Sequence, residues 1–237
     1  MKPISSPKLA RDSPIAAISS RSGRQTPQIC WNVAGIHPAA SSGLKRTLDL
    51  IGSSVGLLLT SILFVPIAIA IKLDSPGPIL FSQRRCGLQG KPFRLWKFRS
   101  MVRDAEGLKH LVKNEAEGHI FKSKCDPRTT RIGRFLRRTS LDELPQFWNV
   151  WRGEMSLIGT RPPTLEEVSQ YEPHHFLRLR VKPGITGEWQ VYGRSQVRDF
   201  EDIVALDLRY QQRWSIGYDL NLLLKTFWIV LQQKGAC

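Results

Sequence analysis

The feature that most constrains this chain is a run of about twenty residues, 50–71, that carries no charged side chain. A helix of roughly 20 apolar residues is long enough to cross the hydrocarbon core of a bilayer. Lys45 and Arg46 precede the run, and Lys72 follows it. Positive charge normally marks the cytoplasmic side of a spanning helix. Because both flanks are basic here, the sequence predicts that both ends lie on the same side of the membrane.

Pro66 lies inside this uncharged run. Proline has no N–H and its ring clashes with the preceding turn, so a helix is expected to bend there. We therefore expect residues 44–73 to form a re-entrant helix–break–helix that enters one leaflet and returns, with the break at Pro66. A single span with a proline kink explains the same segment, and both readings stay open at this point.

The formal net charge of +15 points to a polyanionic partner. Nucleic acid, anionic lipid headgroups and phosphorylated substrates all meet that description. The uncharged run and the lack of a recognisable nucleic-acid motif argue against a nucleic-acid-binding protein. The four cysteines form no C-x-x-C pair, which argues against a structural zinc or a disulfide framework and fits a reducing cytoplasm: they are Cys30, Cys86, Cys125 and Cys237.

The remainder of the chain predicts a mostly α-helical fold with a few short β-strands, an α+β class. Residues 1–43 are rich in Ser, Pro, Arg and Ala and are expected to be a disordered basic tail. Residues 74–237 are expected to form a folded domain with interfacial amphipathic helices. Strands are expected at 79–81, 93–98 and 185–191, and helices at 101–117, 140–151, 164–179, 200–212 and 220–233.

Two adjacent acids, Asp142 and Glu143, are the most informative polar residues. Ser140 with Glu143 fits a capping box, and Pro145 is tolerated only near the start of a helix. The pair is therefore predicted at a helix N-terminus, where the helix dipole favours anions such as phosphate. Three arginines come just before it: Arg134, Arg137 and Arg138. The alternative is that both acids only cap the helix.

From about Leu44 to its end, the chain resembles the bacterial sugar transferase family of polyprenyl-phosphate glycosyl-1-phosphate transferases, in its small monotopic form. The resemblance rests on several segments that occur in order. They are Lys45-Arg46-x-x-Asp49; Ser75-Pro76-Gly77-Pro78; Lys97-Phe98-Arg99-Ser100-Met101; Asp126-Pro127-Arg128 with Thr130-Arg131; Thr139 to Gln146 with Trp148-Asn149-Val150; Met155 to Gly159 with Arg161-Pro162; and Val181 to Gly187 with Gln190 and Gly193-Arg194.

The resemblance implies a reaction and roles for the acids. Such an enzyme moves a sugar-1-phosphate from a UDP-sugar to polyprenyl (undecaprenyl) phosphate and releases UMP, a first membrane step in exopolysaccharide, capsule or glycan assembly. Asp142 matches the nucleophile that forms an aspartyl-phosphosugar intermediate, and Glu143 matches the Mg²⁺ ligand. A carboxylate needs nearby cations to attack an anionic diphosphate, which agrees with these roles. The implied location is the cytoplasmic face of the bacterial inner membrane.

The resemblance also supplies candidates for substrate binding. The diphosphate and the carrier phosphate are expected to meet five cations: Lys97, Arg99, Arg137, Arg161 and Arg194. Pro162 and Gln190 are expected to shape the nucleotide pocket. His174 and His175 have no partner at metal-ligand spacing in the sequence and are expected at the surface.

The chain departs from the family pattern at Val65, where many members have a serine before the membrane proline. Thr60 or Ser61, from the previous turn, is expected to satisfy the opened backbone instead. A nucleotide-sugar transferase that acts without a covalent step shares all the substrates and stays a rival. The identity of the sugar, the pathway and the oligomeric state are left open.

Overall fold

The computed structural model describes residues 35–121, 123, 126–193, 197 and 199–232, and the fold is mostly helical with short strands, as predicted. The α-helices are α1 (Pro38–Ser41), α2 (Gly43–Asp74), α3 (Arg131–Arg138), α4 (Gln146–Trp151), α5 (Leu165–Ser169), α6 (Glu188–Tyr192), α7 (Phe200–Arg213) and α8 (Ile216–Leu231). The 3₁₀ helices are η1 (Leu88–Gly90), η2 (Lys109–Leu111), η3 (Leu141–Glu143) and η4 (Pro173–Arg180). The strands are β1 (Leu80–Cys86), β2 (Pro92–Phe98), β3 (Ser156–Ile158) and β4 (Gly184–Thr186).

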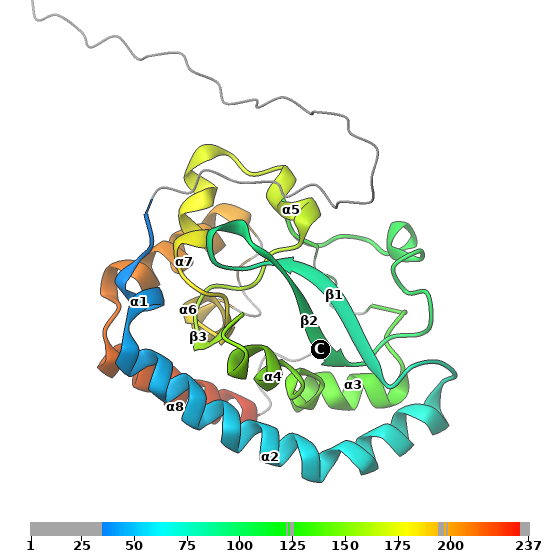
Figure 1. Ribbon diagram of the computed structural model, residues 1–237. Coiled ribbons are helices and arrows are strands. Elements are labelled where there is room, and N and C mark those ends of the chain that lie inside the picture. The colour runs from blue at the N-terminus through cyan, green and yellow to red at the C-terminus, as the bar shows by residue number, and fades with distance from the viewer. Residues whose placement is uncertain (1–34, 122, 124–125, 194–196, 198, 233–237) are drawn as a thin grey trace, which may run out of the picture.

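The apolar run forms one helix, α2, which stays helical through Pro66. The expected interruption into two helices is therefore wrong. Figure 1 shows α2 as a bent helix that runs along one side of the molecule. Thr60 and Ser61 do not take the expected role, because their hydroxyls donate to the carbonyls of Gly56 and Leu57 and not to the carbonyl of Ile62, four residues before Pro66. Such back-bonding by Ser and Thr itself bends helices.

Polar contacts fix both ends of α2 to the globular body. Near its start, the Lys45 ammonium lies 2.6 Å from the Asp219 carboxylate, and both groups are buried. One turn later, Asp49 accepts hydrogen bonds from the Ser156 hydroxyl and the Leu157 N–H, each at 2.9 Å. At its end, Asp74 accepts from the N–H of Ile132 at 2.9 Å. Both ends of α2 are thus anchored to the same globular body.

Glycines let the middle of α2 approach α4 and β3 closely. A Cβ atom at Gly52 would lie 2.5 Å from a Leu157 methyl carbon, and one at Gly56 would lie 2.4 Å from the Phe147 ring. Such small residues allow close contact of a helix with its neighbour. Thr60 continues the contact by donating to the Leu144 carbonyl at 3.3 Å.

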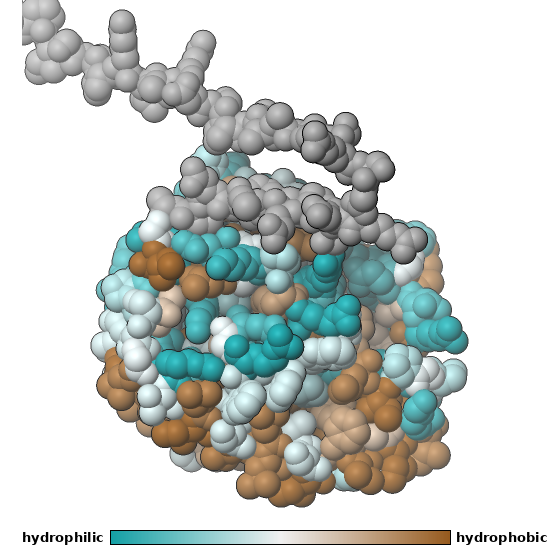
Figure 2. All heavy atoms as spheres, viewed as in Figure 1, coloured by the Kyte–Doolittle hydropathy of each residue, from teal (hydrophilic) through white to brown (hydrophobic). Residues whose placement is uncertain are grey.

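The opposite face of α2 is apolar and exposed, and α8 extends the same surface. The two helices form the lower edge of the molecule in Figure 1, where Figure 2 shows mainly hydrophobic residues. Among the described residues, α2 is the helix that is long and apolar enough to cross a membrane. We call this surface the apolar face; its exposed side chains include Ile51, Val55, Leu58, Ile62 and Val65 of α2 and Leu224, Phe227, Trp228 and Leu231 of α8.

The strands expected at 79–81 and 93–98 are confirmed as β1 and β2, although β1 continues to Cys86. β1 and β2 pair antiparallel, from Leu80 opposite Phe98 to Cys86 opposite Pro92. A second, parallel pair joins β3 to β4. The buried Asn149 of α4 ties the hairpin to the helices, because its amide donates to the Arg94 carbonyl at 2.7 Å and accepts from the Trp96 N–H at 3.2 Å.

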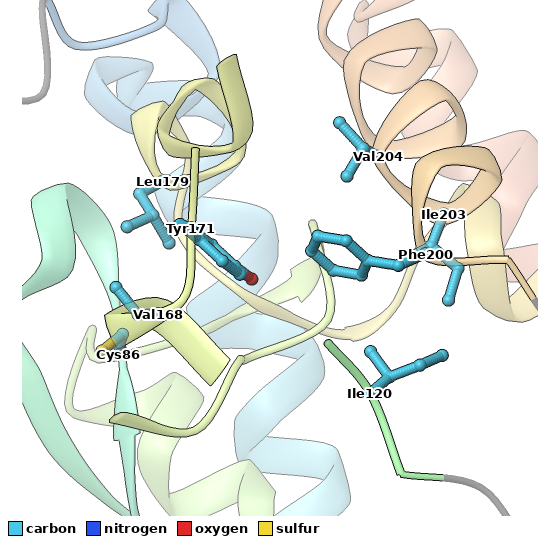
Figure 3. Packing of buried hydrophobic residues seen from close by; sticks show 8 residues of the cluster. All are labelled: Cys86, Ile120, Val168, Tyr171, Leu179, Phe200, Ile203 and Val204. Carbon is cyan, nitrogen blue, oxygen red and sulfur yellow. The ribbon is translucent and has the colours of Figure 1, made fainter. Parts of the chain in front are cut away.

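The body packs around a buried cluster between η4 and α7, shown in Figure 3. The rings of Tyr171 and Phe200 face each other there at a centroid distance of 5.5 Å. Arg178, buried beside them, forms an ion pair with Asp207 at 2.6 Å and donates to the Tyr171 hydroxyl at 2.6 Å. Two other apolar clusters lie beneath the hairpin and beneath the end of α2.

Several predicted elements differ from the structure. Residues 101–117 form turns and the short η2 rather than a helix, because their polar sequence offers no apolar face to bury. The helix expected over 164–179 divides at Pro173 into α5 and η4, as proline disrupts an ongoing helix. The strand expected over 185–191 is β4 followed by α6.

The expected tail boundary at residue 43 is too late. Within that segment, α1 begins at Pro38, and the His37 side chain accepts from the Ala39 N–H as its N-cap. Ala39 is buried, so the folded body includes these residues. Residues 1–34 of the predicted tail lie outside the described residues. The C-terminal helices expected at 200–212 and 220–233 are confirmed as α7 and α8.

Candidate active site

A cavity of about 1270 Å³ opens beside the β1–β2 hairpin. Its walls come from the hairpin, the segments 99–106 and 118–121, residues 123, 126 and 128, α3, η3 and α5. Both predicted acids, Asp142 and Glu143, line it together with four of the five predicted cations: Lys97, Arg99, Arg137 and Arg161. Residues far apart in the sequence are thus brought to one polar cavity.

The acid pair is held on the tight turn η3. Ser140 has a left-handed backbone (φ 58°), and its side chain makes no capping hydrogen bond. The predicted capping box is therefore wrong, and α4 begins only at Gln146 with Pro145 as its N-cap. The acids lie in the first turn of η3 and precede α4, so the alternative that they only cap a helix stays open. Asp142 is buried and Glu143 is partly exposed to the cavity.

Lys97 and Glu143 contact each other across the cavity. The Lys97 ammonium on β2 lies 2.7 Å from a Glu143 carboxylate oxygen. Both side chains are about 30% exposed, at 29% and 31%. A partly hydrated pair can exchange partners with a ligand at low cost, because exposed ion pairs contribute little net free energy.

Arg137 is held by neutral groups instead. Its Nε donates to the Ser100 hydroxyl at 2.9 Å, and its Nη1 donates to the Thr129 hydroxyl at 3.3 Å. Within the described residues, Arg137 forms no ion pair with a carboxylate, and its Nη2 group makes no hydrogen bond. A guanidinium has five N–H donors, so Arg137 offers both charge and donors to an anion in the cavity.

Close packing at Gly133 places Arg137 beside these hydroxyls. A Cβ atom at Gly133 would lie 1.9 Å from the Ser100 carbonyl oxygen, so α3 can lie against the end of β2 only with glycine there. Thr130 caps α3 by accepting from the Gly133 N–H at 3.0 Å. Arg137 follows one turn later on the same helix and therefore projects toward Ser100.

Arg161 forms an ion pair with Glu167 on the far wall, at 3.1 Å. Burial opposes ionisation of Glu167, but the Arg161 charge outweighs it, so the pKa of Glu167 lies below its ordinary value. Arg85 lies nearby, and burial together with the Arg161 charge lowers the pKa of Arg85 to about 10. Glu167 thus balances the charge of Arg161 before any ligand binds.

Asp126 and Arg128 form a second balanced pair that the sequence motif contains but that we did not single out. Arg128 donates to both carboxylate oxygens of Asp126, at 2.8 and 2.7 Å, and these bonds lower the pKa of Asp126. Ser100 and Thr129 were also missed as site residues. Asp126, Arg128 and Ser100 occur in the segments that carry the family resemblance, and Thr129 lies directly between two of its residues, which was the available signal.

Arg99 lines the cavity, but its guanidinium serves the end of α2. It donates to the carbonyls of Ile71, Ser75 and Pro76. Lysine or arginine side chains commonly satisfy such terminal carbonyls. Its predicted role in substrate binding stays a prediction.

The remaining predicted residues do not meet at the cavity. Pro162 is buried behind Arg161, and its carbonyl accepts from Arg85 at 2.9 Å. Gln190 lies on α6 and is not among the cavity residues. Arg194 lies outside the described residues. A nucleotide pocket shaped by these residues stays a prediction.

Asp142 and Glu143 fit a Mg²⁺ ion by their chemistry. Mg²⁺ prefers oxygen ligands and commonly uses one or two carboxylates together with substrate phosphates. The other buried carboxylates of the cavity, Asp126 and Glu167, are already held by arginines. The contact of Glu143 with Lys97 is partly exposed and can be exchanged for a ligand, so the adjacent carboxylates on η3 are the more suitable donor set.

The expectation that both histidines lie at the surface is wrong for His175. His175 is buried and its Nε2 lies 2.6 Å from Glu201, whereas His174 is exposed and lies 3.0 Å from the same carboxylate. The three side chains could surround a metal ion by distance. However, the Nδ1 of His175 accepts the Glu172 N–H at 2.9 Å, so a neutral ring carries its proton on Nε2 and has no lone pair there for a metal.

Comparison with known proteins decides the family. The profile described as "Bacterial sugar transferase" matches residues 40–233, which is most of the chain. This chain belongs to the bacterial sugar transferase family. The family match covers α2, the cavity and α8 together.

Three curated relatives illustrate the similarity. "Galactosyl transferase CpsE" of Streptococcus agalactiae is 49% identical over 194 residues, which are 81% of this chain and 43% of the relative. "UDP-glucose:undecaprenyl-phosphate glucose-1-phosphate transferase" of Escherichia coli is 41% identical over 200 residues, which are 81% of this chain and 41% of the relative. "Exopolysaccharide production protein ExoY" of Rhizobium meliloti is 38% identical over 198 residues (81% and 87%). The chain thus spans less than half of several sugar transferase relatives and most of another.

Proposed function

We propose that this protein is a polyprenyl-phosphate glycosyl-1-phosphate transferase, which moves a sugar-1-phosphate from a UDP-sugar to undecaprenyl phosphate and releases UMP. The observation that carries the proposal is the placement of Asp142 and Glu143, which face a cation-lined cavity from a turn seated on the apolar helix. The names of relatives, which include undecaprenyl-phosphate phosphotransferases, point to the same reaction class.

In the first step, a carboxylate oxygen of Asp142 attacks the phosphorus that carries the sugar. An O–P bond forms, the bond between that phosphorus and the bridging oxygen breaks, and UMP leaves with that oxygen. Arg137 is suited to bind the diphosphate, because within the described residues it forms no ion pair with a carboxylate and its orientation is fixed by two hydroxyls. Fixed donors that face developing negative charge lower the barrier without reorganisation.

In the second step, a phosphate oxygen of the carrier attacks the same phosphorus. The bond to Asp142 breaks, the carboxylate is restored and a polyprenyl diphosphate sugar forms. Splitting the transfer into two displacements lets two anionic substrates use one site in turn. Lys97 is suited to contact the phosphate groups of both substrates in turn, because its ion pair with Glu143 is partly hydrated and can be exchanged.

Glu143, with Asp142 beside it, would hold Mg²⁺ in this proposal. The ion would neutralise phosphate charge that otherwise repels the attacking carboxylate. Lys97 beside Glu143 limits the negative charge of the acid pair until the substrate arrives.

The proposed location is the cytoplasmic face of the inner membrane, with α2 re-entrant in one leaflet. Two features support it. Both ends of α2 bind the same globular body, and its opposite face is apolar and exposed. The turn that carries the acids contacts the middle of α2 through Thr60 and Leu144, so the cavity would lie beside the lipid surface.

Isolating the first step tests the reaction. The wild-type enzyme, given a UDP-sugar without lipid acceptor, should release UMP in an amount no greater than the enzyme present. Label from the sugar should stay on Asp142 in a peptide map. Asp142→Asn should lose both the label and turnover, since an amide is a poor nucleophile.

The rival without a covalent step predicts a different result. If UMP appears only when both substrates are present, and no labelled peptide is found, transfer is direct and Asp142 serves as a metal ligand or base. If UMP appears under neither condition with any UDP-sugar tested, the proposed reaction itself is wrong.

Cysteine labelling tests the membrane arrangement. Gly43 and Lys72 lie near the two ends of α2 and are exposed. Single cysteines at Gly43 and Lys72 should both resist a membrane-impermeant thiol reagent in intact cells and react after the membrane is opened. Reaction of one position from outside would replace the re-entrant arrangement with a span.

A further inference from the structure

An apolar groove of about 260 Å³ lies between α2, α3 and η3. Every side chain that lines it is apolar, including Leu63, Pro66 and Ala70 of α2, Phe135 of α3 and Leu141 of η3. Pro66 and Phe135 are exposed, so the groove opens to the surface beside the apolar face. An apolar opening of this kind on a protein surface marks a binding site more often than chance exposure does.

The groove and the polar cavity meet at the acid turn. Leu141 lines the groove, while the next residue, Asp142, lines the cavity, so η3 separates the two spaces. Phe98, on the cavity wall, belongs to the same apolar cluster as Leu136 and Ile67 from the groove. A molecule with an apolar chain and a charged head could therefore lie across η3 with each part in a matching environment.

We infer that this groove binds the first isoprene units of the polyprenyl carrier and thereby places its phosphate at Asp142. The inference rests on the proposed function, which requires that a phosphate carried on a membrane-bound chain reach this residue. The volume lies below the range of about 300–1,000 Å³ that encloses a drug-sized ligand. The groove thus holds a short part of the chain, and the remainder stays in the lipid.

Pro66 suits an apolar occupant. It lines the groove from α2, and its ring is apolar and it has no N–H, so it offers no hydrogen-bond donor to a ligand there. A phospholipid acyl chain could also enter an apolar groove, but it does not need its headgroup beside a nucleophile. The dependence of the reaction on the acceptor chain separates the two occupants.

Filling the groove tests the inference. Ala70→Phe adds a ring where the side chain lines the groove. In detergent micelles, with UDP-galactose or UDP-glucose according to which one the wild type uses, the KM for undecaprenyl phosphate should rise about tenfold, because excluding two methylene groups from an apolar site already costs about that factor. The KM for the UDP-sugar should not change. Neither should the KM for an acceptor phosphate too short to fill the groove, with a single isoprene unit.

Ile69→Phe is the matched control. Ile69 is the adjacent residue, is exposed and does not line the groove, and the change adds the same ring. The KM for undecaprenyl phosphate should stay within twofold of wild type in this variant. If Ala70→Phe does not fold, Ala70→Cys can be purified and then alkylated with an aromatic maleimide, with wild type treated in the same way as the reference.

Two outcomes overturn the inference. One is an equal rise in KM for the long and the one-unit acceptor, and the other is an equal effect of the changes at positions 69 and 70. In either case the groove takes ordinary lipid or none, while transfer by the wild type still supports the proposed function. Absence of UMP release by the wild type with every acceptor would instead refute the proposed function.

Discussion

Two arginines are each held by two side chains, yet their surroundings differ in charge. Arg178, in the core between η4 and α7, lies against Asp207 and the Tyr171 hydroxyl and is almost fully buried. Arg137, in the cavity wall, lies against two neutral hydroxyls. A buried charge that is paired serves the fold, because leaving it unpaired is costly. A charge fixed by neutral groups keeps its attraction for an incoming anion.

The largest expected effect comes from breaking the core pair. Arg178→Met leaves Asp207 buried without its partner, which should lower the free energy of unfolding by about 3–5 kcal/mol. In a chain of this size the thermal midpoint should then fall by roughly 10 °C, measured by thermal unfolding in one detergent. A midpoint close to that of wild type would show that the pair is not what holds η4 to α7.

Arg137→Met should show the opposite pattern. The unfolding midpoint should change little, while kcat/KM for the UDP-sugar should fall by about 10²–10³, the usual loss when one fixed donor to a developing charge is removed. Arg137→Lys keeps the charge but loses the two hydroxyl contacts, and it should recover only part of the activity. Full activity in Arg137→Met would remove the distinction between the two arginines.

The ion pair between Arg161 and Glu167 predicts that the stability of the protein depends on pH. The pKa of Glu167 lies below its ordinary value of 4.5. Its pair with Arg161 therefore contributes all of its stabilisation above about pH 4.5 and loses it as the pH falls through the folded-state pKa. Glu167→Gln should lower the unfolding midpoint at pH 7, and the gap from wild type should narrow below pH 4.5.

Glu166→Gln is the control for the loss of one negative charge. Glu166 is exposed and contacts Lys109 at 3.1 Å. This change should shift the midpoint by no more than the small amount typical of a surface pair. If the difference in unfolding midpoint between Glu167→Gln and wild type stays constant down to acid pH, the loss of the Arg161–Glu167 pair does not cause that difference.

The smallest expected effect concerns the hydroxyls that hold Arg137. Ser100→Ala or Thr129→Ala should each lower kcat/KM by about twofold to tenfold, the range for loss of one net hydrogen bond. In the Arg137→Met background the same changes should have no further effect, since their role is to orient that side chain. An unchanged loss in that background would assign the hydroxyls another role.

Local sequence chemistry predicted the parts of the fold that depend on neighbouring residues. The hairpin, α7 and α8 followed from apolar spacing and turn residues. The α2 helix followed from its length without charge, but its continuity through Pro66 did not, because α2 packs along its length on Phe147, Leu157 and other residues from distant segments. The helix predicted over residues 101–117 does not form, because helical propensity without an apolar face to bury does not outweigh the loss of chain entropy.

The candidate site, too, could be predicted from the sequence only in part. The motifs identified Asp142, Glu143 and the cavity cations Lys97, Arg137 and Arg161. Whether each cation faces a carboxylate depends on the tertiary structure, so the sequence could not separate Arg137 from the paired Arg161, or from Arg99 at the end of α2. The left-handed Ser140 that turns the acids into the cavity has no distinctive sequence signal, because serine also suits a helix cap.

The contact between Lys45 and Asp219 has a consequence for how the chain is made. These two residues are 174 positions apart, and the pair is buried in the finished protein. A ribosome that adds about 5–20 residues per second needs roughly 10–35 s to proceed from one to the other. During that interval the apolar helix already exists while its final polar partner does not. In the proposed arrangement the membrane holds α2 during this interval with Lys45 still hydrated, and the body closes onto that helix only when α8 emerges.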